Sequence, residues 1–215
     1  MTDDAEDRDL LFEEFGHAVA QAENGAALCI IQKLSDERGE YGLASGLEIH
    51  SSGPRHIQSN PEILTAGAAF RFALGEAFAD IPLEKKLKLC PSSLALCAKL
   101  GLSDEDFAEA GGVLTAELMR ASIKYFMIAA FFAREWKGLV DDYLPEFTAG
   151  DIVKLEGPNL RQAITMSAMP QQMAEIYPFV VGDKSSIRQM ADDLTGGLHK
   201  QKQIQAHNEK RLAIK

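Results

Sequence analysis

The chain has 215 residues, of which 46% are hydrophobic and 25% are charged, and its formal net charge at pH 7 is -10. This apolar share is too high for a disordered chain and predicts a folded body with its own core. The negative charge repels phosphate backbones and anionic membrane surfaces, which disfavours nucleic-acid binding. The odd number of cysteines, with no CxxC pair, suits a reducing compartment.

The two ends of the chain carry opposite charges. Residues 1–14 hold seven acidic side chains against Arg8, and residues 198–215 hold five basic side chains against Glu209. Because charged termini usually stay mobile, we expect an acidic flexible leader over residues 1–9 and a basic flexible tail over residues 198–215. The acidic start does not resemble an export signal, and the longest apolar run has nine residues, where a membrane span needs about twenty. The sequence predicts a cytoplasmic protein with no membrane span.

The first third of the chain begins with a helical pattern. Apolar residues at helical spacing predict a helix after Asp9, its expected N-cap. The pattern resumes over residues 27–34 beyond Asn24-Gly25, a pair that either ends this helix or kinks a continuous one. Residues 38–60 are rich in glycine and serine and predict a long loop, with a short strand near Leu47 as an alternative.

Helix signals are clearest in the middle of the chain. Asn60-Pro61 joins a capping amide to a proline at the first helical position, which predicts a helix start. Short helices are expected over residues 82–89 and 92–100, and Ser103 is expected to cap the next one. The run at residues 113–137 is apolar on most sides, so we expect a central helix whose residues 125–133, Phe131 included, are almost entirely buried.

The last third predicts short helices over residues 149–156, 159–169, 171–177 and 184–194. Phe179-Val180-Val181 is strand-like and could pair with the segment near Leu47. The fold class expected from all these elements is all-α. It is an irregular single-domain helical bundle over residues 10–197, built around the helix at 113–137, with room for a minor two-stranded β element.

Motifs for catalysis or cofactors are missing from the sequence. None of the five histidines lies in an HExxH pattern or beside a cysteine at zinc-ligand spacing, so no metal site is predicted. His17 follows Glu13 by one helical turn. This spacing fits an axial haem ligand, a general base oriented by a carboxylate, or an ordinary surface pair, and we favour the surface pair. No GxSxG elbow is present and the cysteines lie in apolar settings, so no catalytic residue and no cofactor is assigned.

Two regions are candidates for binding a partner. Methionines at helical spacing around Pro170 either fill gaps in the core or adapt to the surface of another protein. The donor-rich residues 50–56 form either a cradle for an anionic group or an ordinary polar loop. The residues assigned to partner binding are Met166, Met169, Met173, Tyr177, Arg55 and His56.

The sequence therefore favours a non-catalytic protein-interaction subunit, an adaptor or chaperone-like helical protein that binds another protein or forms a homo-oligomer. The alternative is a helical enzyme, or a protein that binds a small molecule or haem in an inter-helical cavity. That alternative would use His17 or residues 50–56.

Overall fold

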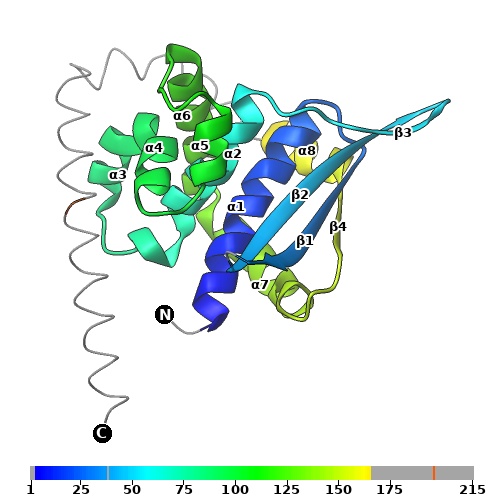
Figure 1. The fold of residues 1–215 in the computed structure, drawn as a ribbon, viewed down its shortest axis with the longest axis horizontal. Helices are drawn as coiled ribbons and strands as arrows, with labels where there is room; N and C mark the ends of the chain where they lie inside the picture. Colours follow the sequence, from blue (N-terminus) through cyan, green and yellow to red (C-terminus); the bar gives the residue numbers. More distant parts are fainter. Residues whose placement is uncertain (1–2, 38, 166–195, 197–215) are drawn as a thin grey trace, which may run out of the picture.

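The computed structural model describes residues 3–37, 39–165 and 196, which form an α+β fold (Figure 1). The elements are α1 (Asp3–Glu23), β1 (Leu28–Asp36), β2 (Gly39–His50), β3 (Gly53–His56), α2 (Pro61–Leu74), the 3-10 turn η1 (Glu76–Phe78), α3 (Leu83–Leu89), the 3-10 turn η2 (Cys90–Ser92), α4 (Ser93–Lys99), α5 (Asp104–Glu109), α6 (Ala116–Phe131), α7 (Ala133–Thr148), β4 (Val153–Glu156) and α8 (Gly157–Thr165). Within the described residues, the strands form one antiparallel sheet in the order β3-β2-β1-β4.

This four-stranded sheet shows that the all-α prediction is wrong. The segment beyond Asn24-Gly25, where the helical pattern resumes, is β1, and the expected helix over residues 149–156 ends in β4. The expected long loop over residues 38–60 contains β2 and β3, so the alternative of a strand near Leu47 is confirmed in a longer form. β1 pairs along its whole length with β2, from Leu28 opposite Leu47 to Asp36 opposite Gly39. The apolar residues of β1 fit a helical period as well as a two-residue period, and only the partner strand decides between them.

Glycines explain why β2 looks like a loop in the sequence. Even-numbered residues of β2 face α1 at very short range. A Cβ atom at Gly42 would lie 2.5 Å from Cγ of Glu14, and one at Gly46 would lie 2.8 Å from Cβ of Gln21. Glycine normally weakens a strand, but here it allows the helix to approach the strand closely. The glycines that make this segment look like a loop in the sequence are therefore required by its packing against α1.

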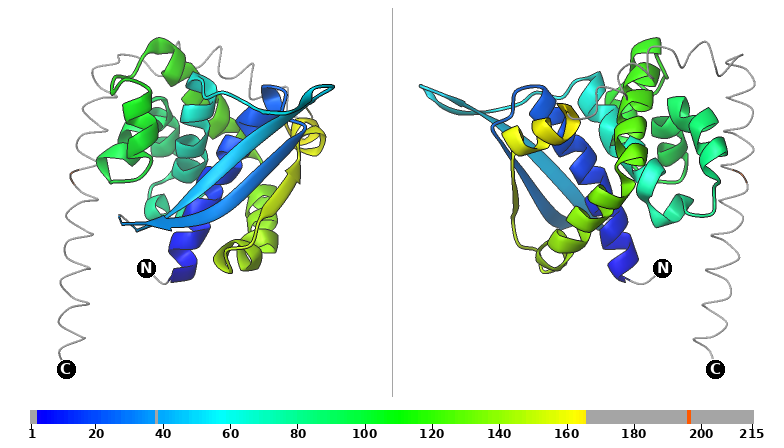
Figure 2. Two further views of the ribbon diagram at one scale, coloured as in Figure 1. Left: turned by 45° about the vertical axis from the view of Figure 1, so that its right-hand side comes forward. Right: turned by 180° about the vertical axis from the view of Figure 1, so that it is seen from behind.

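α1 is the central element of the fold. It lies between the sheet on one side and a layer containing α2 and α6 on the other, and α7 and α8 also pack against it (Figures 1 and 2). Residues 11–16 of this helix are all buried. Its C-terminal end is closed by Arg161 of α8, whose Nη1 donates hydrogen bonds to the carbonyl oxygens of Ala22 and Ala26 at 2.8 Å. Such bonds satisfy carbonyl groups that a helix end leaves free.

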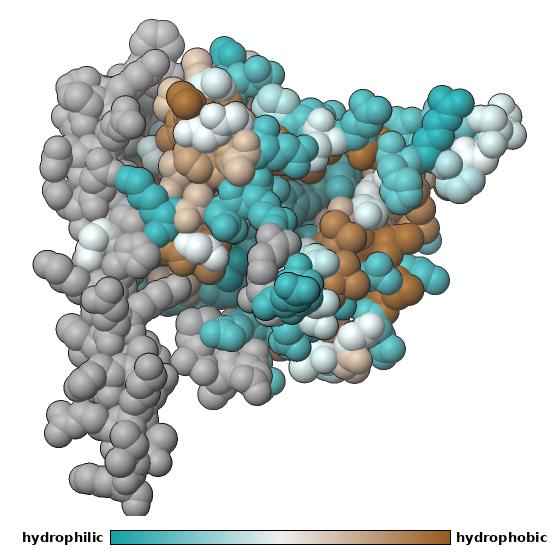
Figure 3. Space-filling model, in the orientation of Figure 1, coloured by the Kyte–Doolittle hydropathy of each residue, from teal (hydrophilic) through white to brown (hydrophobic). Residues whose placement is uncertain are grey.

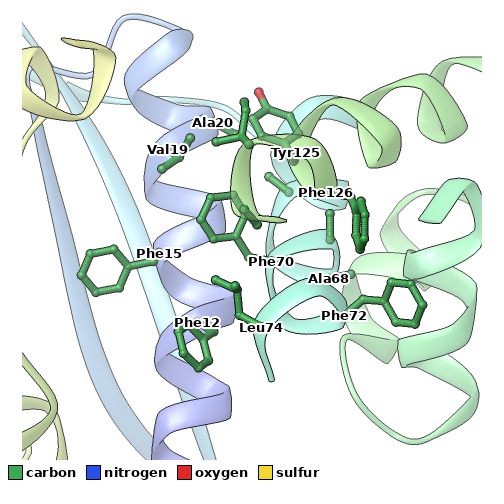
Figure 4. Packing of buried hydrophobic residues seen from close by; sticks show 14 of the residues in the cluster. Phe12, Phe15, Val19, Ala20, Ala68, Phe70, Phe72, Leu74, Tyr125 and Phe126 are labelled. Carbon is green, nitrogen blue, oxygen red and sulfur yellow. The ribbon is translucent and has the colours of Figure 1, made fainter. Parts of the chain in front are cut away.

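The main core lies between α1, α2 and α6 (Figure 4). Phe12 of α1 and Phe70 of α2 are at most 1% exposed. Phe15, on the other side of α1, packs its ring 6.1 Å from the ring of Tyr143 on α7. Phe72 of α2 packs its ring 5.9 Å from the ring of Phe126 on α6. Each such aromatic ring buries a large apolar area, so these contacts supply much of the hydrophobic stabilisation.

The predicted central helix over residues 113–137 is two helices. α6 ends at Phe131 and α7 begins at Ala133, with Phe132 at φ -112° and ψ 30° between them. The break leaves carbonyl groups without helical partners, and Nε1 of Trp136 donates to the carbonyl of Ile128 at 3.1 Å. Residues 125–129 are buried as expected, but Phe131 is 51% exposed, so the expected burial of the whole run is wrong at its end.

Other helix predictions are confirmed. α2 begins at Pro61, and the side chain of Asn60 accepts a hydrogen bond from the Ile63 N–H at 3.0 Å. α3 and α4 match the two expected short helices. The N-terminal acidic residues, expected to form a flexible leader, instead belong to α1 from Asp3 onward. Asp9 does not cap α1; its carboxylate accepts the N–H groups of Glu76 and Ala77 at 2.7 and 3.1 Å.

Several predictions fall outside the described residues. These are the helices expected over 171–177 and 184–194, the strand-like run at 179–181 and the basic tail at 198–215. Among the helices that the structure does describe, none combines the length and the apolar character that crossing a bilayer requires.

The break after α6 generates a prediction about two phenylalanines. Phe126→Ala should lower the free energy of unfolding by about 3–5 kcal/mol, because it opens a cavity in the core. Phe131→Ala is the matched control and should change that free energy by less than about 1 kcal/mol, because its ring is half exposed. Urea denaturation followed by circular dichroism measures both free energies of unfolding. Similar losses for the two variants would mean that Phe131 is buried like Phe126, which would contradict a helix break after α6.

Candidate functional site

A cleft of about 690 Å³ lies between α1, the first half of β2, and the turn that leads into α5. Figure 3 shows a hydrophilic hollow between the helices and the strands. Its lining contains ten carboxyl groups, and Arg71 is the one lysine or arginine among the described residues that line it. The acidic residues are Glu6, Asp9, Glu13, Glu14, Asp36, Glu40, Asp104, Glu105, Asp106 and Glu109.

The floor of the cleft is a polar stripe on α1. Glu6, Leu10, Glu13, His17 and Gln21 follow one another at intervals of three or four residues, so they share one face of the helix. The apolar residues of α1 outside this stripe pack into the core. Within the stripe Glu13 is 6% exposed, whereas Glu6, near the start of the helix, is exposed to solvent.

Glu13 and His17 of this stripe meet Asp106 of α5. One carboxylate oxygen from each acid and a ring nitrogen of the histidine all lie within 4.8 Å of one another. Nε2 of His17 is 3.3 Å from Oδ2 of Asp106. Nδ1 of His17 is 2.8 Å from the carbonyl oxygen of Ile63, which can only accept, so Nδ1 carries a proton and Nε2 faces the two acids.

Glu13 is held from two further sides. Its carboxylate accepts hydrogen bonds from Nη1 of Arg71, with which it forms a buried ion pair, and from Oγ of Ser103. Ser103 was expected to cap α5, but its side chain makes no capping bond and its φ is 54°, in the left-handed region. Backbone in this region is uncommon for residues other than glycine and is found where the surroundings enforce it. The hydroxyl of Ser103 thus hydrogen-bonds Glu13 in the cleft and not the start of α5.

Glu14 and Gln21 bind the edge of β2 at Ala44. The backbone of Ala44 hydrogen-bonds the carboxyl of Glu14, and its carbonyl accepts from Nε2 of Gln21 at 3.0 Å. These two side chains thereby cover part of a strand edge that β3 leaves unpaired. Gln21 is 6% exposed, and its Oε1 has no hydrogen-bond partner within the described part of the chain.

The environment of the cleft raises the pKa values of Glu14 and His17, so both groups hold their protons more strongly. Burial raises the pKa of Glu14 to about 8, and the nearby charge of His17 only partly opposes this. Burial lowers the pKa of His17, but Asp106, by its charge and its hydrogen bond, and then Glu14 and Glu13 outweigh burial and raise that pKa to about 10. Both shifts have the same origin, because negative charge is concentrated where water is scarce.

Of the residues assigned to partner binding, the structure describes Arg55 and His56, and both lie apart from this cleft. Arg55 and His56 are exposed on β3, in the hairpin that projects from the sheet (Figure 1). His50, at the end of β2, pairs with Glu48 at 2.6 Å. The candidate partner-binding residues Met166, Met169, Met173 and Tyr177 lie outside the described residues.

The sequence showed that Glu13 and His17 lie one helical turn apart, but it did not show that the fold buries them. Both side chains are largely buried, so the favoured interpretation as a surface pair is wrong. Asp106 lies far along the chain and belongs to no local motif with them. The cysteines are buried as expected, and burial raises the pKa of Cys29 to about 11, which keeps this thiol neutral.

Comparisons of the chain with protein-family models, curated proteins and solved structures find no match. The function is therefore argued from the geometry and chemistry of the cleft.

The position of His17 generates a prediction about Gly67 on α2. A Cβ atom at Gly67 would lie 2.3 Å from Nε2 of His17, so Gly67→Ala should displace the ring and lower the free energy of unfolding by about 1–3 kcal/mol. Gly138→Ala on α7 is the control, because no described atom lies within 4 Å of its added Cβ. It should be neutral or stabilising by up to about 1 kcal/mol. Chemical denaturation of both variants tests the close approach, which equal effects would exclude.

Proposed function

We propose that the protein binds a positively charged ligand in the cleft between α1, β2 and α5. The observation that carries this proposal is the charge imbalance of the lining, ten carboxyl groups against Arg71. At pH 7 the raised pKa values keep Glu14 mostly neutral and His17 positively charged, and a large excess of carboxylates still remains. A cleft of one charge sign with protein walls concentrates ligands of the opposite charge.

The burial of acidic side chains in the cleft supports this function. Glu13 is 6% exposed, so solvent screens its carboxylate much less than a carboxylate on an open surface. A ligand that brings positive charge replaces some of the solvation that this group lost on folding. The outer part of the cleft carries exposed acids, including Glu6 and Glu109, which attract such a ligand at longer range.

The volume and polarity limit the class of ligand. A space of about 690 Å³ lies within the range of small-molecule sites. Haem, one of the ligands considered from the sequence, is a poor fit because its propionates are anionic and its faces are apolar. A compact cation or a short polyamine fits better. The cleft lies between a helix and a strand edge, whereas the sequence suggested a cavity between helices.

The proposal can be tested with hexaamminecobalt(III), a trivalent cation that binds by charge and hydrogen bonding without exchanging its ammine ligands. We expect saturable binding by isothermal titration calorimetry. Neutralising three exposed acids of the cleft, with Glu6→Gln, Glu40→Gln and Glu109→Gln together, should weaken binding at least about tenfold at low salt.

The matched control neutralises three exposed acids elsewhere, with Glu117→Gln, Asp142→Asn and Glu146→Gln together. Both triple variants change the net charge by +3, so overall charge alone affects them equally. Equal weakening in the two variants, or no saturable binding to the native chain, would refute a ligand site in the cleft.

A protein-interaction function is a second proposal, and the outer face of the sheet supports it. The helices that pack on the sheet, α1, α7 and α8, lie on its other face (Figure 2). On β2, Tyr41, Leu43 and Ile49 are 39%, 44% and 66% exposed, and Figure 3 shows an apolar patch over the strands. Large exposed apolar patches often mark contacts with other proteins.

This second proposal predicts that Leu43→Ser with Ile49→Ser abolishes any specific partner complex or self-association while leaving the melting temperature nearly unchanged, because both side chains face solvent in the free chain. Sedimentation velocity measures self-association. Hydrogen exchange on an isolated complex should show protection over residues 39–56. A complex that survives the double substitution would contradict this role for the sheet.

A further inference from the structure

One part of the cleft has a donor set that suits a metal ion better than an organic cation. Glu13, His17 and Asp106 present two carboxylate oxygens and one ring nitrogen within 4.8 Å of one another. Ligands of one ion, each about 2 Å from it, lie at separations of this order. An organic ammonium group binds any suitably placed hydrogen-bond acceptor, whereas a transition-metal ion forms a coordinate bond with an imidazole nitrogen.

We propose that Glu13, His17 and Asp106 together bind one divalent first-row transition-metal ion, such as Zn²⁺ or Mn²⁺. The inference rests on the proposed function, because the same acidic cleft supplies the attraction for cations. The metal adds direct coordination by named atoms to that general attraction, and on binding it displaces to solvent the proton that Nε2 of His17 otherwise holds.

The surroundings of His17 match those of a metal-binding histidine. Such a histidine usually donates its other ring N–H to a carbonyl or carboxylate, which fixes the orientation of the ring. Nδ1 of His17 makes this contact with the carbonyl of Ile63 at 2.8 Å, and Nε2 is thereby directed at Asp106. The absence of a side chain at Gly67 leaves room for the ring in this position.

The carboxylate of Glu13 is also positioned from behind. Arg71 and Ser103 each hydrogen-bond one of its oxygens. A carboxylate oxygen has more than one lone-pair direction, so each oxygen can still bind an ion while it accepts a hydrogen bond. Asp106 completes the set from the opposite wall, and its side chain is 23% exposed, which leaves a path for an ion to enter.

A separate observation points to an occupant of the cleft. Gln21 is 94% buried and lines the cleft one helical turn beyond His17, and its Oε1 has no hydrogen-bond partner among the described residues. Buried polar atoms are rarely left unpaired in folded proteins. Oε1 is buried in this position, so a ligand or ion-bound water beside Gln21 would supply the missing hydrogen bond once the side chain turned toward it.

The donor types narrow the choice of metal. Imidazole suits Zn²⁺, Fe²⁺ and Ni²⁺, whereas Mg²⁺ and Ca²⁺ prefer oxygen ligands alone. Two carboxylates with one imidazole therefore favour first-row transition ions. We expect Mg²⁺ to bind the native chain more weakly than Zn²⁺ or Mn²⁺.

The test uses the full chain, stripped with a chelator and titrated with Zn²⁺ alone and Mn²⁺ alone by calorimetry. The native chain should take up one ion in the cleft. Asp106→Asn should weaken this binding at least about tenfold, because it removes a charged ligand. Asp104→Asn is the control: it lies on the same helix, lines the same cleft and changes the charge equally, but lies outside the cluster, and it should weaken binding less than about threefold.

Two further variants test whether His17 is the histidine that binds the ion. His17→Gln should also remove the tight site, with circular dichroism and hexaamminecobalt(III) binding to show that the fold and the cleft remain. His199→Ala with His207→Ala should leave the tight site unchanged, because these histidines belong to the basic end of the chain. Loss of the site in that double variant would overturn the assignment.

The outcomes separate the two proposals. If Asp104→Asn and Asp106→Asn weaken Zn²⁺ binding equally, or if hexaamminecobalt(III) binds and no divalent ion binds tightly, the metal site is overturned and the cation cleft stands. If neither kind of cation binds, both proposals fail. One tight ion lost with Asp106→Asn and retained with Asp104→Asn supports the metal site.

Discussion

The enclosure of α1 between the sheet and the α2 and α6 layer is the constraint on which the rest of the structure depends. A helix in this position buries several of its charged residues, and a buried charge is costly unless it is paired or neutralised. Asp7 pairs with Lys33 at 2.8 Å, Asp9 accepts two backbone N–H groups, and Glu13 pairs with Arg71. Glu14 is retained instead by a raised pKa, which favours its neutral form.

These partners come from both sides of α1, so the buried acidic residues of α1, among them Asp7, Asp9 and Glu13, also connect the layers. Lys33 belongs to β1, Arg71 to α2, and Asp106 and Ser103 to the segment around α5. A buried ion pair contributes little net stability compared with apolar residues of the same size, although removal of one partner is strongly destabilising. These acidic residues therefore specify how α1 is oriented more than they stabilise the fold, and the same orientation opens the cleft.

The sequence predicts this fold where the signals are local. Asn60-Pro61 predicted the start of α2 because the capping bond joins residues three apart. β1 and β2 depend on pairing between distant residues, and β2 carries glycines at 42 and 46 for reasons visible only when α1 is in place. The candidate site divides in the same way. The interval from Glu13 to His17 is local, whereas Asp106 reaches them only through the fold.

The glycines give a reason to consider the polar cluster functional. Gly42 makes room for Glu14 and Gly67 makes room for His17, and in each case a Cβ atom would collide with the polar side chain. Glycine inside a strand or helix costs about 0.5–1 kcal/mol relative to alanine. Alanine at positions 14 and 17 would remove both buried polar groups and both of these close approaches. Both glycines lower the stability of the fold, and both lie beside the polar cluster. Destabilising features of this kind concentrate at ligand-binding and catalytic sites.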